Sequence, residues 1–181
     1  CIEICPENAL TLTPEGIVTD FDTCTLCGKC ADACPTKAIE MSGKLYSTEE
    51  ILAIIDKERV HIDQSGGGVT FSGGEPLMHS DFLIEMLKAC GKKGLHRVVD
   101  TSGFADTKTL LEVAHLTDLF LFDLKLMDPG KHKKWTGVDN RLILKNLKLL
   151  AENGANINIR IPLINNVNMD KNELSEMAGF V

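Results

Sequence analysis

Short apolar runs alternate with longer stretches that are apolar on one side only, from residue 67 to the end of the chain. The short runs predict four strands, at residues 68–71, 96–99, 119–122 and 157–161. The longer stretches have apolar residues at helical spacing and predict helices at about residues 80–93, 106–116 and 139–152. Strands separated by helices of this length form right-handed β-α-β units. The pattern therefore predicts an α/β protein with a parallel sheet, either part of a TIM-like barrel or an open sheet.

Residues that commonly begin and end helices support these boundaries. Ser47 and Glu50 form a capping-box pattern, so a helix should begin after Ser47. Asp106 is a suitable N-cap for the helix that follows it. Gly94 can end the preceding helix, because glycine readily adopts the left-handed conformation. Cys90, on the apolar side of that helix, is expected to be a buried core residue.

Polar residues and glycines stand at the end of every predicted strand. They are Ser72, Gly73, Gly74 and Glu75 in the first, Asp100, Thr101 and Ser102 in the second, Asp123, Leu124 and Lys125 in the third, and Arg160 in the fourth. The carboxyl ends of parallel strands share one side of a sheet, where ligands bind in such folds. Acids suit an amine or a cation, and bases suit a carboxylate, so the set predicts a site for a small zwitterion. A tight turn at Gly73 and a structural ion pair between Asp123 and Lys125 are the alternatives for single residues.

Composition narrows the class of protein. The 181 residues are 44% hydrophobic and 25% charged, with a net charge of −7. Such a chain can bury a core and is neither a disordered tail nor a general nucleic-acid binder. No apolar run approaches the roughly 18 residues of a membrane helix. We therefore expect a cytoplasmic protein with no membrane or nucleic-acid partner.

The cysteines are concentrated at one end, with six of the seven in the first 34 residues. Residues 24–35 read Cys24-Thr-Leu-Cys27-Gly-Lys-Cys30-Ala-Asp-Ala-Cys34-Pro35. This is the C-x2-C-x2-C-x3-C-P run of bacterial ferredoxins, which binds [4Fe–4S] clusters. Zinc ligands usually come as two separated pairs, and a disulfide framework fits this α/β chain less well, so iron–sulfur binding is the favoured interpretation.

Cys1 and Cys5, followed by Pro6, match the end of a second such run. In two-cluster ferredoxins the fourth cysteine of one run binds the other cluster. One complete ligand set is therefore Cys5, Cys24, Cys27 and Cys30, whereas Cys1 and Cys34 belong to a second cluster whose other ligands we expect upstream of residue 1. Residues 1–12 and 24–41 look like two half-repeats, each a cluster loop followed by a short strand. We predict a ferredoxin-like domain at 1–46 and an α/β domain at 47–181.

The whole chain resembles a known family. Residues 66–77, Gly-Gly-Gly-Val-Thr-Phe-Ser-Gly-Gly-Glu-Pro-Leu, are similar to the second strand of radical S-adenosylmethionine (SAM) enzymes, and more narrowly to the activating enzymes of glycyl radical enzymes. The resemblance continues through Asp100-Thr101-Ser102-Gly103, Phe122-Asp123-Leu124-Lys125 and Ile159-Arg160-Ile161-Pro162. The cysteine-rich segment resembles the subgroup with a two-cluster insert. The family implies a partial TIM-like radical SAM barrel with a ferredoxin-like iron–sulfur insert.

The resemblance also implies roles for single residues. Gly73, Gly74 and Glu75 would hold the amino group of SAM. Asp123, Leu124 and Lys125 would contact SAM, with Lys125 suited to its carboxylate, and Arg160 would contact it from the next strand. Asp100 and Thr101, with Asp123 and the Leu121 carbonyl, match positions that bind a monovalent cation beside SAM in some relatives.

One family feature is missing from the sequence. Radical SAM enzymes bind their catalytic cluster through Cys-x3-Cys-x2-Cys, and no such triplet occurs here. Cys1 and Cys5 have the first spacing only. We therefore expect the triplet upstream of residue 1 and further barrel strands downstream of residue 181. We expect no catalytic residue in this chain and no SAM cleavage by it alone.

The function that the family implies is reductive cleavage of SAM to a 5′-deoxyadenosyl radical, which removes a hydrogen from a glycine of a partner enzyme. The implied partners are that glycyl radical enzyme and a flavodoxin or ferredoxin electron donor, with anaerobic function because exposed clusters oxidise easily. Trp135, within residues 131–137, would face the partner or lie in a plain surface loop. The alternative function is a two-cluster electron carrier fused to a small-molecule-binding α/β domain, which leaves the Gly-Gly-Glu strand end unexplained.

Overall fold

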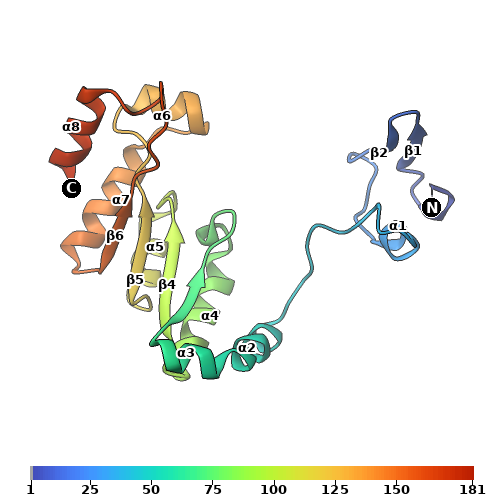
Figure 1. The fold of residues 1–181 in the computed structure, drawn as a ribbon, viewed down its shortest axis with the longest axis horizontal. Coiled ribbons are helices and arrows are strands. Elements are labelled where there is room, and N and C mark those ends of the chain that lie inside the picture. Colours follow the sequence, from blue (N-terminus) through green and yellow to red (C-terminus); the bar gives the residue numbers. More distant parts are fainter. Residues whose placement is uncertain (1) are drawn as a thin grey trace. The chain divides into compact units, whose positions relative to one another are not determined.

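The chain forms two compact units, Cys1–Tyr46 and Ser47–Val181, which we describe separately (Figure 1). The computed structural model describes residues 2–181. Cys1, a predicted cluster ligand, lies outside the described residues. No helix within residues 2–181 combines the length and the apolar character that crossing a bilayer requires.

A four-stranded parallel sheet is the centre of the second unit, with the strand order β3-β4-β5-β6. Its strands are β3 (Gly68–Phe71), β4 (His96–Thr101), β5 (Leu119–Asp123) and β6 (Ile157–Arg160). The three predicted helices between them are present as α4 (Ser80–Lys92), α5 (Thr107–Ala114) and α7 (Arg141–Glu152). The predicted α/β class and parallel sheet are confirmed.

The strands β4 and β5 are longer than their apolar runs. Asp100 and Thr101 pair with Leu121 and Phe122, and Asp123 pairs with Arg160. Polar residues that the sequence places after the strands are therefore the last residues of the strands themselves. Their backbones are fixed by the sheet, which makes the rim more rigid than a loop.

The main core lies between the sheet and the helices α4, α5 and α7 (Figure 1). On β5, Phe120 and Phe122 are almost completely buried in this core, whereas Leu121 between them is half-buried. This alternation is the period-2 pattern of a strand whose two faces differ. Cys90, on α4, is fully buried in a smaller cluster, as predicted.

The predicted helix signals are present in the structure. Before α2 (Thr48–Lys57), Ser47 accepts a hydrogen bond from the Glu50 amide at 3.2 Å, and the Ser47 amide donates to the Glu50 carboxylate at 2.9 Å. Asp106 accepts hydrogen bonds from two amides at the start of α5. Gly94 has a φ of 68° just after α4, in the left-handed region.

Three further elements of the second unit were not predicted: α3 (Arg59–Ser65), the 3-10 helix η2 (Pro76–His79) and α6 (Pro129–Thr136). The helix α8 (Lys171–Phe180) follows β6. The surface-loop prediction for residues 131–137 is wrong, because most of them form α6. Asp128 caps this helix by accepting from the Lys131 amide at 2.6 Å, and Pro129 and the left-handed Gly137 mark its two ends.

The first unit contains a small antiparallel hairpin of β1 (Leu10–Thr13) and β2 (Gly16–Thr19). The 3-10 helix η1 (Ile2–Ile4) precedes the hairpin, and α1 (Lys29–Asp32) follows it. The strand predicted in the second half-repeat, after Cys34, is wrong: residues 36–46 form no strand. A strand needs a hydrogen-bonding neighbour, and β1 already pairs with β2, which lies between the two half-repeats.

An ion pair joins β4 to the start of β5 and gives a testable pH dependence. The Arg97 side chain donates to both carboxylate oxygens of Asp118 at 2.9 Å. This hydrogen bond holds the pKa of Asp118 below its usual value of about 3.8. A depressed carboxyl pKa stabilises the fold above the unfolded pKa, and that stability is lost as the pH falls through the folded pKa.

We therefore expect the unfolding free energy of the wild type to fall more steeply below about pH 4 than that of Asp118→Asn, which has no carboxyl group at this position. Urea unfolding at a series of pH values measures the difference. Parallel curves for the two proteins would contradict this account of the pair.

Candidate functional site

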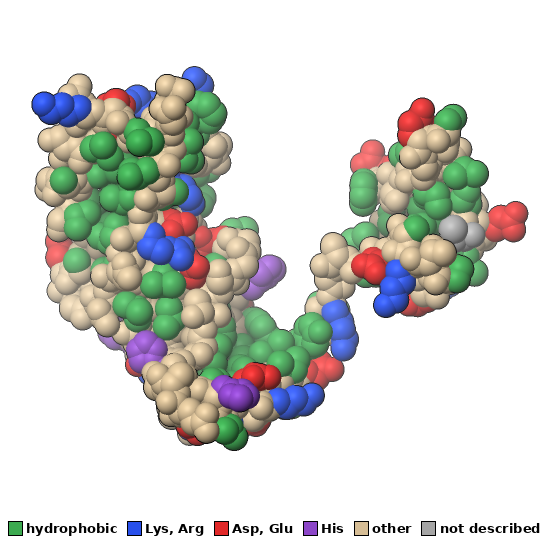
Figure 2. Space-filling model, viewed as in Figure 1, with side chains coloured by type: hydrophobic (Ala, Val, Ile, Leu, Met, Phe, Trp, Pro, Cys, Tyr) green, Lys and Arg blue, Asp and Glu red, His purple; other side chains and the backbone are tan. Residues whose placement is uncertain are grey.

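A polar cavity of about 240 Å³ lies at the carboxyl ends of the four parallel strands. Its lining residues come from all four strand ends and are Ser72, Gly73, Gly74, Glu75, Asp100, Thr101, Ser102, Asp123, Lys125 and Arg160. The structure thus brings together every residue that the sequence analysis placed at this rim except Leu124. In the space-filling view, acidic and basic side chains of the second unit adjoin one another, bordered by apolar surface (Figure 2).

Leu124 lies at the rim but turns its side chain into the protein. The side chain is 1% exposed, so it does not line the cavity. The Leu124 amide donates to the Arg160 carbonyl at 2.9 Å, which ties the end of β5 to the end of β6. A direct contact between Leu124 and a ligand remains a prediction, and the structure assigns its side chain to packing.

Arg160 lies between the two aspartates of the cavity. Its guanidinium donates to Asp123 at 2.8 and 3.0 Å and also to Asp100. The hydrogen bond with Asp123 is the main cause of a raised pKa of Arg160, with a smaller contribution from Asp100. The Arg160 charge thus offsets two clustered carboxylates. Those carboxylates were the predicted ligands of a monovalent cation, so such a cation would have to share them with Arg160.

Lys125 is the second base of the cavity. Its ammonium group lies 3.6 Å from Asp123, and its side chain is 38% exposed. Ser72 donates from its hydroxyl to Asp100 at 3.1 Å. Because Lys125 is paired at a longer distance than Arg160, it is the cation more readily available to a carboxylate from outside the protein.

Glu75 lines the cavity, and its carboxylate is already bound by donors of the protein itself. Its carboxylate accepts from the Thr101 hydroxyl at 2.6 Å, from the Ser102 hydroxyl at 2.6 Å and from the Ser102 amide at 2.9 Å. It also accepts from the Leu77 amide at 3.3 Å. A carboxylate has about four acceptor sites, so these four donors nearly saturate it. The side chain therefore fastens the segment after β3 to the end of β4.

The two glycines before Glu75 leave open space at the cavity. Gly73 has a φ of 125°, which favours glycine. A Cβ atom added at Gly73 or Gly74 would meet no other atom within 4 Å. Backbone groups at these positions can thus be approached closely by a ligand, as the sequence predicts. Together, two acids, two bases and open backbone fit a molecule that carries both an amine and a carboxylate.

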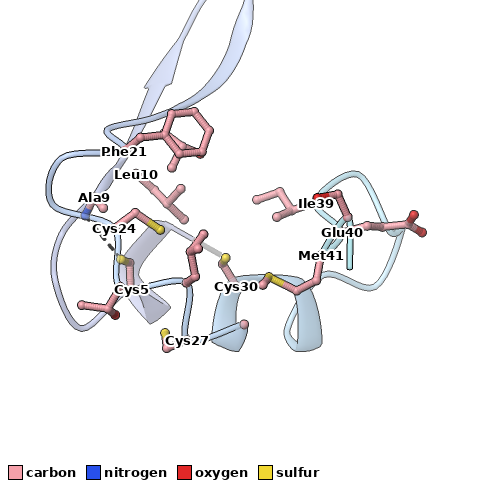
Figure 3. Close-up of a pocket in the computed structure, with 15 residues that line it drawn as sticks. Cys5, Ala9, Leu10, Phe21, Cys24, Cys27, Cys30, Ile39, Glu40 and Met41 are labelled. Atoms are coloured by element: carbon pink, nitrogen blue, oxygen red, sulfur yellow. Dashed lines mark hydrogen bonds between the residues drawn. The ribbon is translucent and has the colours of Figure 1, made fainter. Parts of the chain in front are cut away.

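A second cavity, of about 250 Å³, lies within the first unit and has four cysteines in its lining: Cys5, Cys24, Cys27 and Cys30. They are the four that the sequence analysis placed in one ligand set, and three of them come from the short segment 24–30, which ends in α1 (Figure 3). Cys34, predicted to belong to a different cluster, is buried and does not line this cavity. The Ala9 amide donates to the sulfur of Cys5 at 3.3 Å.

The arrangement of these thiols bears on what they can hold. Within residues 2–181, no three His, Cys, Asp or Glu side chains lie close enough together to hold a single metal ion. A four-iron cluster instead takes one thiolate at each iron, so its ligands surround a space. Four thiols that line one cavity are compatible with a [4Fe–4S] cluster, and their role as ligands remains a prediction.

Comparison with protein families gives two matches. The sequence model of the radical SAM superfamily matches residues 24–178, and that of the 4Fe-4S dicluster domain matches residues 1–38. Together these imply iron–sulfur clusters and SAM as cofactors.

Several curated proteins are similar along the whole chain. The chain is 46% identical to the trans-4-hydroxy-L-proline dehydratase activating enzyme of Clostridioides difficile, covering 100% of this chain and 61% of that protein. It is 40% identical to the (2S)-3-sulfopropanediol dehydratase activating enzyme of Klebsiella oxytoca, covering 100% of this chain and 58% of that protein. The chain thus spans about three-fifths of the length of the curated relatives that it matches.

Two solved structures are also similar. A domain of a pyruvate-formate lyase-activating enzyme from Bacteroides vulgatus is 49% identical, with a TM-score of 0.60 over 63% of this chain and 71% of that one. SuiB of Streptococcus suis, bound to the precursor peptide SuiA, is 18% identical, with a TM-score of 0.63 over 79% of this chain and 31% of that one. The second likeness concerns the fold alone.

Proposed function

The chain belongs to the radical SAM superfamily, and from this premise we propose that it acts within an activating enzyme of a glycyl radical enzyme. The names of the similar curated proteins support this proposal, since each is an activating enzyme. The observation that carries it is the strand-end cavity, whose two acids, two bases and open glycine backbone suit the amino and carboxylate groups of SAM.

The residues of the cavity would divide the work of holding SAM. Backbone groups of Gly73 and Gly74 would receive the amino group, and Lys125 would pair with the carboxylate. Asp123 holds Arg160 and approaches Lys125, so it would orient both bases. Glu75 would act by fixing the Gly-Gly segment against Thr101 and Ser102, since its own acceptor sites are already filled.

The cysteines of the first unit would hold an auxiliary cluster. We propose Cys5, Cys24, Cys27 and Cys30 as one ligand set and Cys34, with Cys1, as ligands of a second cluster in a ferredoxin-like domain. When bound to a reduced catalytic cluster, SAM supplies a 5′-deoxyadenosyl radical. No residue of this chain is proposed as a ligand of that catalytic cluster, because the sequence contains no Cys-x3-Cys-x2-Cys triplet.

We also propose the fold, the electron donor and the cellular setting of the whole protein. The sequential strand order and the helices between strands support a barrel, because each barrel strand pairs with its predecessor. We also propose a flavodoxin or ferredoxin as electron donor and anaerobic function in the cytoplasm. Asp100 and Thr101 remain our proposed site for a monovalent cation beside SAM.

The test is glycyl radical formation by the full-length protein. After anaerobic reconstitution with iron and sulfide, the protein is mixed with dithionite, SAM and a glycyl radical enzyme encoded beside it. We expect an electron paramagnetic resonance doublet on the partner and 5′-deoxyadenosine in the supernatant. An electron carrier would give reduced clusters without 5′-deoxyadenosine, and that result would overturn the proposal.

A further inference from the structure

Three buried asparagines bind the backbone segments that leave β4, β5 and β6 next to the strand-end cavity. Asn140 and Asn146 are 0% exposed, and Asn168 is 1% exposed. Asn140 precedes α7, Asn146 lies within α7, and Asn168 lies between β6 and α8. Each donates two hydrogen bonds from its side-chain amide to backbone carbonyls. The side-chain oxygens of Asn146 and Asn168 also accept hydrogen bonds, whereas the buried oxygen of Asn140 has no partner among the described residues. Burial of these side chains therefore depends chiefly on the hydrogen bonds that their amide groups donate.

Asn140 and Asn168 hold the segment after β5. The amide nitrogen of Asn140 donates to the carbonyls of Leu126 and Met127 at 2.8 and 2.7 Å. That of Asn168 donates to the Lys125 carbonyl at 2.9 Å. Three successive carbonyls after Leu124 therefore bind side chains from elsewhere in the chain. These bonds fix the backbone from which the Lys125 side chain projects into the cavity.

Asn168 also joins this segment to the end of β6. Its amide nitrogen donates to the Pro162 carbonyl at 2.8 Å, and its side-chain oxygen accepts from the Ile164 amide at 2.8 Å. One side chain thus ties the backbone two residues beyond Arg160 to the backbone of Lys125. The two bases of the cavity are thus held in register by a side chain that binds backbone carbonyls and neither of the two charged groups.

Asn146 holds the backbone segment that follows β4. Its amide nitrogen donates to the carbonyls of Gly103 and Ala105 at 2.8 and 2.9 Å. Its side-chain oxygen accepts from the Thr107 hydroxyl at 2.9 Å. Gly103 follows Ser102, which donates two hydrogen bonds to the Glu75 carboxylate.

We infer that Asn140, Asn146 and Asn168 are positioning residues, which hold the strand-end segments in the geometry that binds SAM. The inference rests on the proposed function for its ligand. Only a primary amide offers two N–H donors together with an acceptor in so small a side chain. The carbonyls that it satisfies lie outside strands and helices, so no regular structure would bind them in its place. The rim is therefore formed before the ligand arrives.

The test compares Asn140→Asp with the wild type, using the full-length reconstituted protein. Aspartate has nearly the same size but replaces the two donors with an acceptor. We expect hydrogen exchange at residues 124–128 to accelerate about tenfold while exchange in the core strands stays unchanged. SAM affinity, measured by equilibrium dialysis, should fall about tenfold, as for other groups that orient ligand-binding residues. Asn153→Asp is the matched control, because Asn153 donates similarly to Leu149 but is exposed.

Two comparisons separate positioning from general stability. Asn140→Ser keeps one donor and should give intermediate exchange and affinity. In a Lys125→Met background, Asn140→Asp should cause little further loss of SAM affinity, because the residue acts through Lys125. Three results would overturn the inference. The first is an additive loss of SAM affinity in the double variant, and the second is unchanged hydrogen exchange at residues 124–128. The third is faster exchange of the whole domain in both Asn140 variants. If the wild type binds no SAM, the proposed function fails, and the exchange data still decide whether the asparagines hold these segments.

Discussion

Replacement of Glu75 with alanine is expected to weaken SAM binding about 100-fold and to lower the free energy of unfolding by about 2 kcal/mol. The Glu75 carboxylate accepts from Thr101, from both donors of Ser102 and from the Leu77 amide. Its removal leaves four donors to water and releases the Gly73-Gly74 segment from β4. Affinity should fall more than stability, because the side chain is only half-buried while the glycines line the cavity.

Glu75→Gln is the matched variant. In the wild type, one carboxylate oxygen of Glu75 binds the amide and hydroxyl of Ser102, and the other binds the Thr101 hydroxyl and the Leu77 amide. The amide nitrogen of glutamine must replace one of these two oxygens. Hydroxyl groups can rotate and accept, but a backbone amide cannot. The Leu77 amide bond is the longer one, at 3.3 Å, so glutamine should turn its nitrogen that way and lose only that bond. We expect an affinity loss well below that of alanine. Isothermal titration calorimetry measures the SAM affinity of both variants. A Glu75→Ala variant that binds SAM as tightly as the wild type would refute the role of Glu75.

Replacement of Cys24 with serine is expected to remove about four iron atoms from each full-length protein chain. Cys24 lines the cysteine cavity with Cys5, Cys27 and Cys30. Serine is a poor ligand of iron–sulfur clusters, and a cube that has lost one of four ligands is exposed to solvent. Iron and sulfide analysis after anaerobic reconstitution measures the change.

Cys90→Ser is the control for this experiment. Cys90 is fully buried in an apolar cluster, and this burial raises the pKa of its thiol, so we do not expect it to bind metal. Its replacement should leave the iron content at the wild-type value. Equal iron content in Cys24→Ser and the wild type would contradict the ligand set, and so would an iron loss in Cys90→Ser.

Much of the second unit could be predicted from the sequence, because local patterns determine it. The alternation of apolar runs predicts all four strands, and Ser47, Asp106 and Gly94 mark helix ends by their own backbone preferences. The polar residues after these strands could be grouped at one rim because parallel strands all end on the same side. The helix α6 was missed because it has few apolar residues, although Asp128, Pro129 and Gly137 marked its ends.

The remaining features depend on contacts between distant segments. Glu75 meets Thr101 and Ser102 across 26 and 27 residues of sequence, so nothing local shows that its acceptor sites are filled. Asn146 in α7 is buried for a similar reason, since its partner Gly103 lies 43 residues away. Asparagine is mostly exposed in folded proteins, and only the tertiary structure shows the partners that let Asn146 lie among the buried residues of α7.

The central claim is that the strand-end cavity binds SAM, and the most direct test is the affinity of the full-length, reconstituted protein for SAM in the wild type and in Lys125→Met. Lys125 is the base that we expect to pair with the carboxylate of SAM, and methionine keeps most of its length without the charge. We predict one SAM bound per wild-type chain and an affinity at least about tenfold weaker in the variant, with iron content unchanged. No binding by the wild type, or equal affinities in the two proteins, would contradict the account.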